Sequence, residues 1–333
     1  MAMSAQPSND PLAPPLCDAQ GRRMTYLRLS LTDRCNFRCV YCSPATWGGK
    51  SHLLDVDQIG RLVEVFARMG IVRVRLTGGE PLFRKDIVEI AGRIAGTEGI
   101  GELCATTNGY QLPELARPLK QAGLKSLNIS LDTLDAERFA KLSGGRGEVS
   151  RVVAGIDTAV AEGFEVKLNA VVMRDVNEHD CAELIRFAWA RKLVVRFIEC
   201  MPFREGKPVP TAELIELLGS QGLALEPDDA PSEATRGPAR YVRGAGGRVG
   251  FISPMTQNFC AGCNRVRVAA NGDLRACLGG REQAPLSQLL HEGADAAALA
   301  TAIRAALGSK PEGHRFNDPD AKAALLPMMG IGG

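Results

Sequence analysis

The sequence predicts an α/β fold built around a parallel sheet. Between residues 26 and 221, short runs rich in β-branched and other apolar residues alternate with longer stretches of helical periodicity. A strand that pairs in parallel with the preceding strand needs a crossover connection, which a helix usually supplies. The strand runs are apolar at most positions, which is typical of strands buried on both faces.

This alternation predicts six strands and seven helices. The predicted strands cover residues 26–31, 71–76, 103–106, 126–130, 166–173 and 194–199. The predicted helices cover residues 55–69, 86–95, 112–122, 136–142, 149–162, 178–191 and 211–221. Gly70 ends the first helix, because glycine is a common residue just beyond a helix end.

The pattern changes after residue 222. Residues 223–245 are rich in Pro, Gly, Asp and Glu, and we expect a linker or irregular segment there. Asn271-Gly272 predicts a hairpin turn, because both residues tolerate positive φ. Short strands are predicted at 248–252, 265–269 and 274–277, and helices at 286–292 and 296–307. We therefore expect a flexible N-terminal tail (1–24), a βα body (25–222) and a C-terminal extension (223–333).

Composition excludes several classes of protein. The formal net charge of the 333 residues is only +2, which argues against general binding to nucleic acid or to an anionic membrane. No segment approaches about twenty uninterrupted apolar residues, and the polar, Pro-rich start of the chain does not resemble a signal peptide. The ten cysteines are expected to serve metal or redox chemistry in the cytoplasm rather than disulfides.

Six of the cysteines form two groups of three. The run C-N-F-R-C-V-Y-C contains Cys35, Cys39 and Cys42. The run C-A-G-C and a later cysteine supply Cys260, Cys263 and Cys277. Because a zinc ion or an ordinary iron–sulfur cubane takes four protein ligands, two groups of three predict two clusters, each with one iron open to an outside molecule. A single four-thiolate zinc site built from the two C-x2-C pairs is the alternative.

Polar residues follow the predicted strands where parallel-barrel enzymes place their active sites. The run T-G-G-E-P, residues 77–81, follows the second strand, and its glycines allow a close backbone approach to a ligand. Thr106, Ser130 and Met201 lie at the ends of the third, fourth and sixth strands.

Basic residues lie within strands that are predicted to be buried. They are Arg28, Arg73, Arg75, Lys167, Arg196, Arg265 and Arg267. The spacing of two puts Arg73 and Arg75 on one face of their strand, and Arg265 and Arg267 on one face of theirs. Buried positive charge needs an anionic partner, and guanidinium groups suit phosphate oxygens. The sequence therefore predicts an interior that holds a polyphosphate.

The first cysteine run, with an aromatic residue before its third cysteine, resembles the radical S-adenosylmethionine (SAM) superfamily. Together with R-L-T-G-G-E-P, F-C-A-G-C-N-R-V-R-V and the terminal Gly-Gly, it is similar to the GTP 3′,8-cyclase family of molybdenum-cofactor biosynthesis. The resemblance runs from about residue 25 to residue 333. It implies an incomplete six-stranded (βα)6 triosephosphate-isomerase-like barrel, whose open side is closed by the C-terminal iron–sulfur extension.

The resemblance also implies an activity. A 5′-deoxyadenosyl radical would take the C3′ hydrogen of GTP, and bond formation to guanine C8 followed by reduction would give 3′,8-cyclo-7,8-dihydro-GTP. Two [4Fe-4S] clusters would serve this reaction, one binding SAM and the other the guanine. Implied partners are a flavodoxin- or ferredoxin-like electron donor and a downstream cyclic pyranopterin monophosphate synthase. A homodimer is an oligomeric state that the sequence leaves open.

Residue roles follow by motif position. The resemblance assigns SAM contacts to Tyr41, Gly79, Glu80, Thr106, Ser130 and Met201. It assigns GTP contacts to Arg28, Arg75, Lys167, Arg196, Arg265 and Arg267. It assigns catalytic roles to Arg28, Gly332 and Gly333. We expect the other cysteines, Cys17, Cys104, Cys181 and Cys200, to be small buried or tail residues.

Two other functions remain open from the residues alone. A different radical enzyme with auxiliary clusters, such as a peptide-modifying one, would carry more C-terminal ligands and no arginine-lined interior. An electron carrier or zinc scaffold would not need the Gly-Gly-Glu-Pro run or the arginines on strands.

Overall fold

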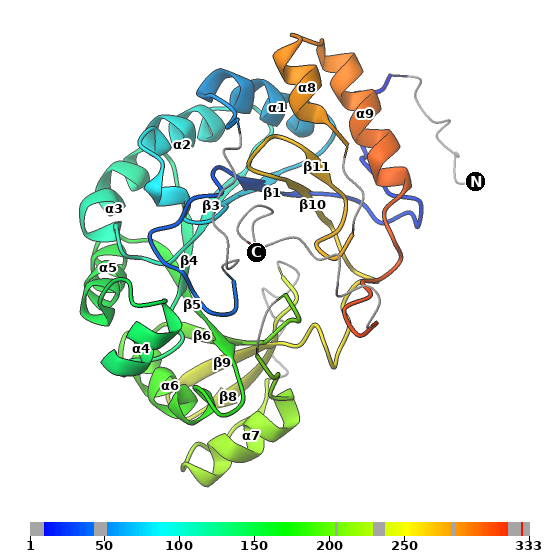
Figure 1. The fold of residues 1–333 in the computed structure, drawn as a ribbon. Coiled ribbons are helices and arrows are strands. Elements are labelled where there is room, and N and C mark those ends of the chain that lie inside the picture. The colour runs from blue at the N-terminus through cyan, green and yellow to red at the C-terminus, as the bar shows by residue number, and fades with distance from the viewer. Residues whose placement is uncertain are drawn as a thin grey trace.

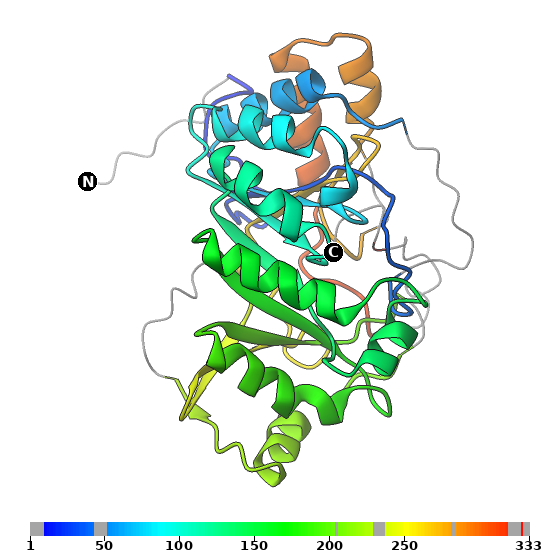
Figure 2. The same ribbon diagram turned by 90° about the vertical axis from the view of Figure 1, so that its left-hand side faces the viewer.

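The computed structural model describes residues 10–42, 52–203, 206–228, 237–280, 284–318 and 328. Its strands form a single sheet with the order β11-β10-β1-β2-β3-β4-β5-β6-β9-β8-β7. The sheet curves around an interior that stays open on one side, and helices cover its outer face (Figures 1 and 2).

The six predicted parallel strands are confirmed. They are β1 (Tyr26–Ser30), β2 (Arg73–Thr77), β3 (Glu102–Thr107), β4 (Ser126–Ser130), β5 (Glu165–Val172) and β6 (Val194–Glu199), each parallel to its neighbours. The helices around them are α1 (Val56–Arg68), α2 (Ile87–Ala95), α3 (Leu112–Gln121), α4 (Ala136–Leu142), α5 (Val149–Ala161), α6 (Cys181–Ala190) and α7 (Thr211–Ser220).

Three helix starts differ from the predicted bounds, and one of them, that of α2, differs by a single residue. Asp55 is the N-cap of α1 rather than its first residue, because its carboxylate accepts a hydrogen bond from Gln58 N in a capping box. The helix predicted from residue 178 begins at Cys181, after a short 3-10 turn, Glu178–Asp180. The Glu178 carboxylate accepts hydrogen bonds from the backbone N–H groups of Asp175 and Val176, which holds that turn apart from the helix.

The C-terminal extension adds strands to both edges of the parallel sheet. At one edge β9 (Gly247–Ile252) pairs in parallel with β6, and at the other β10 (Arg265–Val268) pairs in parallel with β1. Residues 253–264 join these two edges, so this segment crosses the open side of the sheet. It carries Cys260 and Cys263, and the extension therefore continues the barrel wall as well as covering its opening.

The expectation of an irregular segment at residues 223–245 is wrong at two places. Glu226–Pro227 forms β7 and Arg240–Gly244 forms β8, which pairs antiparallel with β9. The turn between β8 and β9 packs closely on a tryptophan ring: a Cβ at Gly246 would lie 2.3 Å from a ring carbon of Trp189. The run G-A-G-G at 244–247 is a hairpin signal in the sequence. The residues of β8 before it are too polar to predict a strand.

The hairpin at Asn271-Gly272 is confirmed, although its turn differs in type. β10 pairs antiparallel with β11 (Leu274–Arg275). Ala269 N donates to Asp273 O at 2.8 Å, and Gly272 N donates to Ala269 O at 2.9 Å. Among the described residues here, only Gly272 has positive φ, at 92°. The connection is a three-residue loop with glycine in the left-handed region, rather than a two-residue turn.

Residues 10–24 lie within the predicted flexible tail, but they pack against the body of the protein. Leu16 and Met24 are fully buried. Arg304 of α9 (Ala296–Gly308) donates to the carbonyls of Pro11, Ala13 and Pro15. The apolar residues of this Pro-rich segment are therefore core residues. α9 and α8 (Leu286–His291) in turn pack beside α1 (Figure 1).

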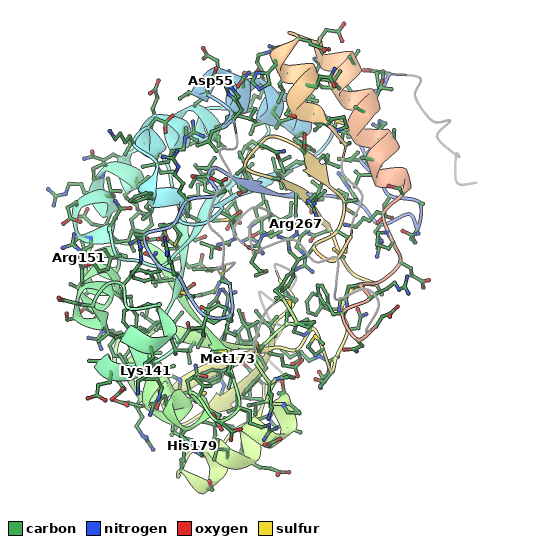
Figure 3. All side chains as sticks on the ribbon, in the orientation of Figure 1. Asp55, Lys141, Arg151, Met173, His179 and Arg267 are labelled. Carbon is green, nitrogen blue, oxygen red and sulfur yellow. The ribbon has the colours of Figure 1, made fainter. Side chains whose placement is uncertain are left out.

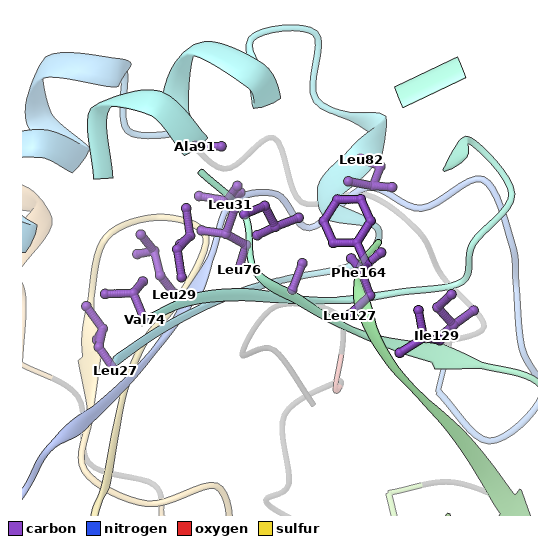
Figure 4. Close-up of a cluster of buried hydrophobic side chains, with 14 of the residues drawn as sticks. Leu27, Leu29, Leu31, Val74, Leu76, Leu82, Ala91, Leu127, Ile129 and Phe164 are labelled. Carbon is purple, nitrogen blue, oxygen red and sulfur yellow. The ribbon is translucent and has the colours of Figure 1, made fainter. Parts of the chain in front are cut away.

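Strand alternation divides the core from the interior. Leu27 and Leu29 of β1, Val74 and Leu76 of β2, and Leu127 and Ile129 of β4 belong to the buried cluster between the sheet and the helices (Figure 4). The intervening residues, such as Arg28 and Arg75, therefore face the opposite side, into the interior. In the part of the chain that the structure describes, no helix is long and apolar enough to cross a membrane.

A pair of helical glycines tests this packing. A Cβ at Gly155 in α5 would lie 2.2 Å from Gly109 O, whereas a Cβ at Gly92 in α2 would meet nothing within 4 Å. We expect Gly155→Ala to lower the free energy of unfolding by about 1–3 kcal/mol through overpacking. Gly92→Ala should raise it by about 0.5–1 kcal/mol. Urea unfolding measures both changes, and equal effects would contradict the tight contact between α5 and residue 109.

Candidate active site

A cavity of about 680 Å³ occupies the interior of the curved sheet. Most predicted site residues line it, namely Arg28, Cys35, Cys39, Tyr41, Cys42, Arg75, Gly79, Glu80, Thr106, Ser130, Arg196, Met201, Cys260, Cys263, Arg265, Arg267 and Cys277. Lys167 is not among the lining residues. Gly332 and Gly333 lie outside the described residues.

Hydrogen bonds hold the first cysteine loop in a fixed conformation. Arg38 N and Val40 N donate to Ser143 O and Leu142 O, at 2.9 and 3.0 Å, which fixes the loop against the end of α4. Phe37 N donates to Cys35 Sγ at 3.3 Å. These contacts hold the chain in a turn, and Cys35, Cys39 and Cys42 of this turn line the cavity.

The Gly-Gly pair after β2 also allows two backbone segments to approach closely. Gly79 N donates to Thr32 O at 2.7 Å, and Glu80 N donates to Arg34 O at 2.8 Å. A Cβ at Gly78 or Gly79 would lie 2.3 Å from a backbone oxygen of Thr32 or Arg34. The glycines therefore let the 77–81 loop press against the segment that leads into Cys35, and this close backbone approach is to the chain itself.

Glu80 links two strand-end loops. Its carboxylate accepts hydrogen bonds from Leu82 N, Thr107 Oγ1 and Asn108 N, at 3.0, 2.7 and 2.7 Å. Glu80 is only 1% exposed, and burial raises its pKa to about 7, although these hydrogen bonds lower it. The neighbouring Asn108 amide also lies 3.8 Å from Cys35 Sγ. Glu80 thus supports the first cysteine loop and places an acidic group beside it.

Tyr41 and Asp132 form a second buried contact at this loop. Tyr41 OH donates to Asp132 Oδ2 at 2.7 Å, and Val171 N donates to Asp132 Oδ1 at 2.8 Å. Burial raises the pKa of Asp132 to about 6, although both hydrogen bonds lower it. The cysteine loop is therefore joined to the ends of β4 and β5.

Three arginines form a row across adjacent strands. In the sheet register Arg28 pairs with Arg267 on one side and with Arg75 on the other. Arg267, within the ring of strands in Figure 3, is 6% exposed. Burial and the charges of Arg28 and Arg265 lower the pKa of Arg267 well below its usual value. Burial also lowers the pKa of Arg28 to about 10, with Tyr26 opposing and Arg75 and Arg265 adding to the effect. The row is a site that favours an anion.

The neighbouring basic groups are oriented by polar side chains. Arg75 donates to Tyr26 OH, and to Ala105 O at 2.8 Å. Arg196 Nε donates to Asn169 Oδ1 at 3.0 Å. These contacts fix the directions of both guanidinium groups in the cavity wall.

Lys167 and Arg73 lie toward the amino ends of their strands. Lys167 forms an ion pair with Glu165 at 2.5 Å, and Arg73 forms one with Glu102 at 2.5 Å. Lys167 shares the inner face of β5 with Asn169, which does line the cavity, but it lies further from the strand's carboxyl end. A role for Lys167 in ligand binding stays a prediction.

The second cysteine group has basic surroundings. Although burial raises the pKa of Cys263, Arg265 and Lys310 lower it below its usual value. By contrast, burial and Glu80 raise the pKa of Cys35 in the first group to about 12. The surroundings of the first group are therefore acidic and those of the second are basic.

Each group of three cysteines is closely spaced. Besides burial, Cys35, Cys42 and Asp132 raise the pKa of Cys39, whereas Cys277 and Cys263 raise that of Cys260. Among the described residues, which include all six thiols, no three His, Cys, Asp or Glu side chains converge to hold a single metal ion. Two sets of thiolates that need not meet at one point fit cubanes, which bind each sulfur at a different iron.

Sequence analysis missed several residues that line the cavity. They are Arg22, Tyr26, Asn128, Lys310, His314 and Phe316. The alternation along β4 could have identified Asn128, because it shares an inner face with Ser130. Arg22 and Lys310 approach from irregular segments, and no periodic signal marks them.

The remaining cysteines behave largely as expected. Cys104, Cys181 and Cys200 are buried, and Cys17 is partly buried in the packed N-terminal segment. None of them lines the cavity.

The chain matches two family models in succession. Residues 29–188 match the Radical SAM superfamily, and residues 193–316 match Molybdenum Cofactor Synthesis C. A GTP 3′,8-cyclase of Pseudomonas putida (strain W619) is 44% identical over 96% of this chain and 98% of its own length. One of Brucella ovis is 42% identical over 94% and 93%. The chain belongs to the GTP 3′,8-cyclase family, a family of radical SAM enzymes.

Solved structures with the same fold include SuiB of Streptococcus suis. Its structure bound to precursor peptide SuiA matches with a TM-score of 0.62 at 17% identity, over 89% of this chain and 73% of that chain. Its structure bound to S-adenosylmethionine matches with a TM-score of 0.59, over 89% and 72%. At this identity the likeness shows the fold alone. The open parallel sheet of this chain is thus the radical SAM fold.

The raised pKa of Glu80 predicts a pH dependence of stability. Because the pKa in the folded protein (about 7) exceeds the ordinary value of 4.5, the folded state binds the proton more tightly. The stability from this group is complete below pH 4.5 and is lost as pH rises through 7, by about 3 kcal/mol in all. Urea unfolding at pH 5 and at pH 8 measures the free energy of unfolding of the ligand-free protein. Between these pH values, Glu80→Gln should lose less of this free energy than the parent chain. Exposed Glu137 supplies the control, Glu137→Gln, and an unchanged pH dependence in Glu80→Gln would contradict the argument.

Proposed function

We propose that this chain converts GTP to 3′,8-cyclo-7,8-dihydro-GTP by radical SAM chemistry, in the first step of molybdenum-cofactor biosynthesis. The observation that carries the proposal is one cavity that is lined by both cysteine triads and by the arginine row. The names of relatives at 42–44% identity support the same reaction.

Cys35, Cys39 and Cys42 would hold the [4Fe-4S] cluster that the radical SAM family uses, together with SAM. When bound, these groups supply one-electron chemistry that abstracts a hydrogen atom from the substrate. Tyr41, Gly79, Glu80, Thr106, Ser130 and Met201 stay proposed SAM contacts, and all of them border the cavity. The acid side chain of Glu80 suits an ammonium group, while Asp132 keeps the loop in place through Tyr41.

The arginine row would bind the triphosphate. Arg28, Arg75 and Arg267 face the cavity from neighbouring strands, and Arg265 and Arg196 add charge nearby. Phosphate oxygens would place negative charge beside these guanidinium groups, and each contact would be a charge-assisted hydrogen bond. Binding of the triphosphate would thus hold the ribose and base between the two triads.

Cys260, Cys263 and Cys277 would hold a second [4Fe-4S] cluster, whose open iron would bind the guanine. The support is the donor set of three closely spaced thiols and the basic side chains around them. Gly332 and Gly333 stay predicted catalytic residues. The electron donor, the downstream synthase, the homodimer and the cytoplasmic location also stay predictions, as does the domain division at residue 222.

Product analysis tests the activity. The chain is reconstituted anaerobically with iron and sulfide and then incubated with SAM, GTP and dithionite. We expect about eight irons per chain, as two cubanes require, and formation of 5′-deoxyadenosine together with a cyclised nucleotide. ATP in place of GTP is the control. Formation of 5′-deoxyadenosine that does not depend on GTP would contradict the proposal.

Removing one guanidinium from the row tests the triphosphate site. We expect Arg267→Gln to weaken GTP binding roughly 10- to 100-fold, because a hydrogen bond to a charged group contributes about 1.5–3 kcal/mol. Equilibrium dialysis with labelled GTP measures this change in the reconstituted protein. Arg117→Gln, on the exposed face of α3, is the matched control and should bind GTP normally. Equal GTP affinity in both variants would remove Arg267 from the site.

A further inference from the structure

Two basic side chains, partly buried Arg22 and buried Lys310, donate hydrogen bonds to the backbone beside the second cysteine triad. We propose that they are positioning residues that fix Cys260, Cys263 and Cys277 relative to one another. We further infer that the charge of Lys310 balances the anionic group that these thiolates bind. The inference rests on the second cluster of the proposed function and concerns how this chain holds it.

Arg22 connects the N-terminal segment to the first cysteine of the triad. Its Nη1 donates to Cys260 O at 2.9 Å and to Glu312 O at 2.7 Å, and its Nη2 donates to Pro311 O at 2.7 Å. Its Nε is held by Asp18 Oδ2 at 2.6 Å, and the Asp18 side chain is fully buried. One planar guanidinium therefore joins three segments that are far apart in the sequence.

Lys310 connects the other two cysteines. Its Nζ donates to Arg265 O at 2.7 Å, two residues after Cys263, and to Ala276 O, directly before Cys277. Because Pro311, which accepts from Arg22, is the next residue, the two cations act on adjoining positions of one segment. Between them they bind the backbone beside all three thiols.

The charge of Lys310 has an unusual setting. The residue is 4% exposed and lines the cavity, and the groups that accept its hydrogen bonds are neutral carbonyls. Burial lowers the pKa of Lys310, while the nearby Cys263 and Cys277 raise it. A buried ammonium group is costly unless an anion lies close. Thiolates that bind an iron–sulfur cluster would supply that anion, whereas the charge of Arg22 is already matched by Asp18.

The test uses the full chain, reconstituted anaerobically, and reads each cluster separately. The variants are Arg22→Gln, Lys310→Met and Lys310→Arg. Exposed Arg23 supplies the matched control Arg23→Gln. Exposed Lys125, which donates to Gly101 O at 2.6 Å, supplies the control Lys125→Met. Iron content and electron paramagnetic resonance spectra are measured with SAM alone and with GTP alone.

We expect the parent chain and both controls to carry about eight irons. Arg22→Gln and Lys310→Met should lose the GTP-sensitive signal and about half of the iron, while the SAM-sensitive signal of the first cluster persists. If Lys310→Met keeps a second cluster, its reduction potential should shift to more negative values. Lys310→Arg should restore the signal, because it restores the charge.

Three results would overturn the inference. The first is full iron and an unchanged GTP-sensitive spectrum and potential in Arg22→Gln and Lys310→Met. The second is loss of both signals, since these residues would then support the whole fold rather than the triad. The third is a parent chain with about four irons and only a SAM-sensitive signal. That third result would also remove the second cluster from the proposed function, whereas the first would leave it intact.

Discussion

Three guanidinium groups lie side by side on the inner face of the sheet because its register pairs Arg28 with both Arg75 and Arg267. Burial is the main cause of the lowered pKa values of Arg28 and Arg267, and the neighbouring guanidinium groups add to it. The register of three strands thus sets the geometry of a buried basic row that favours an anion in the cavity.

The surroundings of the two triads differ in charge because different ionisable side chains lie beside each of them. At the first triad, buried Glu80 and Asp132 hold the loop through hydrogen bonds and leave acidic groups nearby. At the second, Arg265 and Lys310 supply positive charge beside Cys263. The groups around the first triad are therefore acidic and those around the second are basic.

Periodicity explains how much of this could be predicted. The alternation along β1, β2 and β10 assigns Arg28, Arg75 and Arg267 to one face without any knowledge of their partners, and the cysteine spacings identify both triads. What the sequence did not predict depends on contacts between distant segments. Arg22 and Lys310 meet through main-chain carbonyls, which leave no pattern in the side chains. Gly78 and Gly79 likewise depend on a contact between separate segments, because they allow the close approach of the backbone at residues 32–34.

The path of residues 253–264 has a consequence for synthesis on the ribosome. Until β9 and β10 have emerged, the β6 edge and the β1 edge of the sheet both lie unpaired, and unpaired parallel strands invite association with other chains. The contacts of the first triad's loop are complete once β5 has formed, because Val171 holds Asp132 beside Tyr41. The hydrogen bonds that Arg22 makes beside Cys260 need residues 311 and 312. The loop of the first triad can therefore fold well before the surroundings of the second triad are complete.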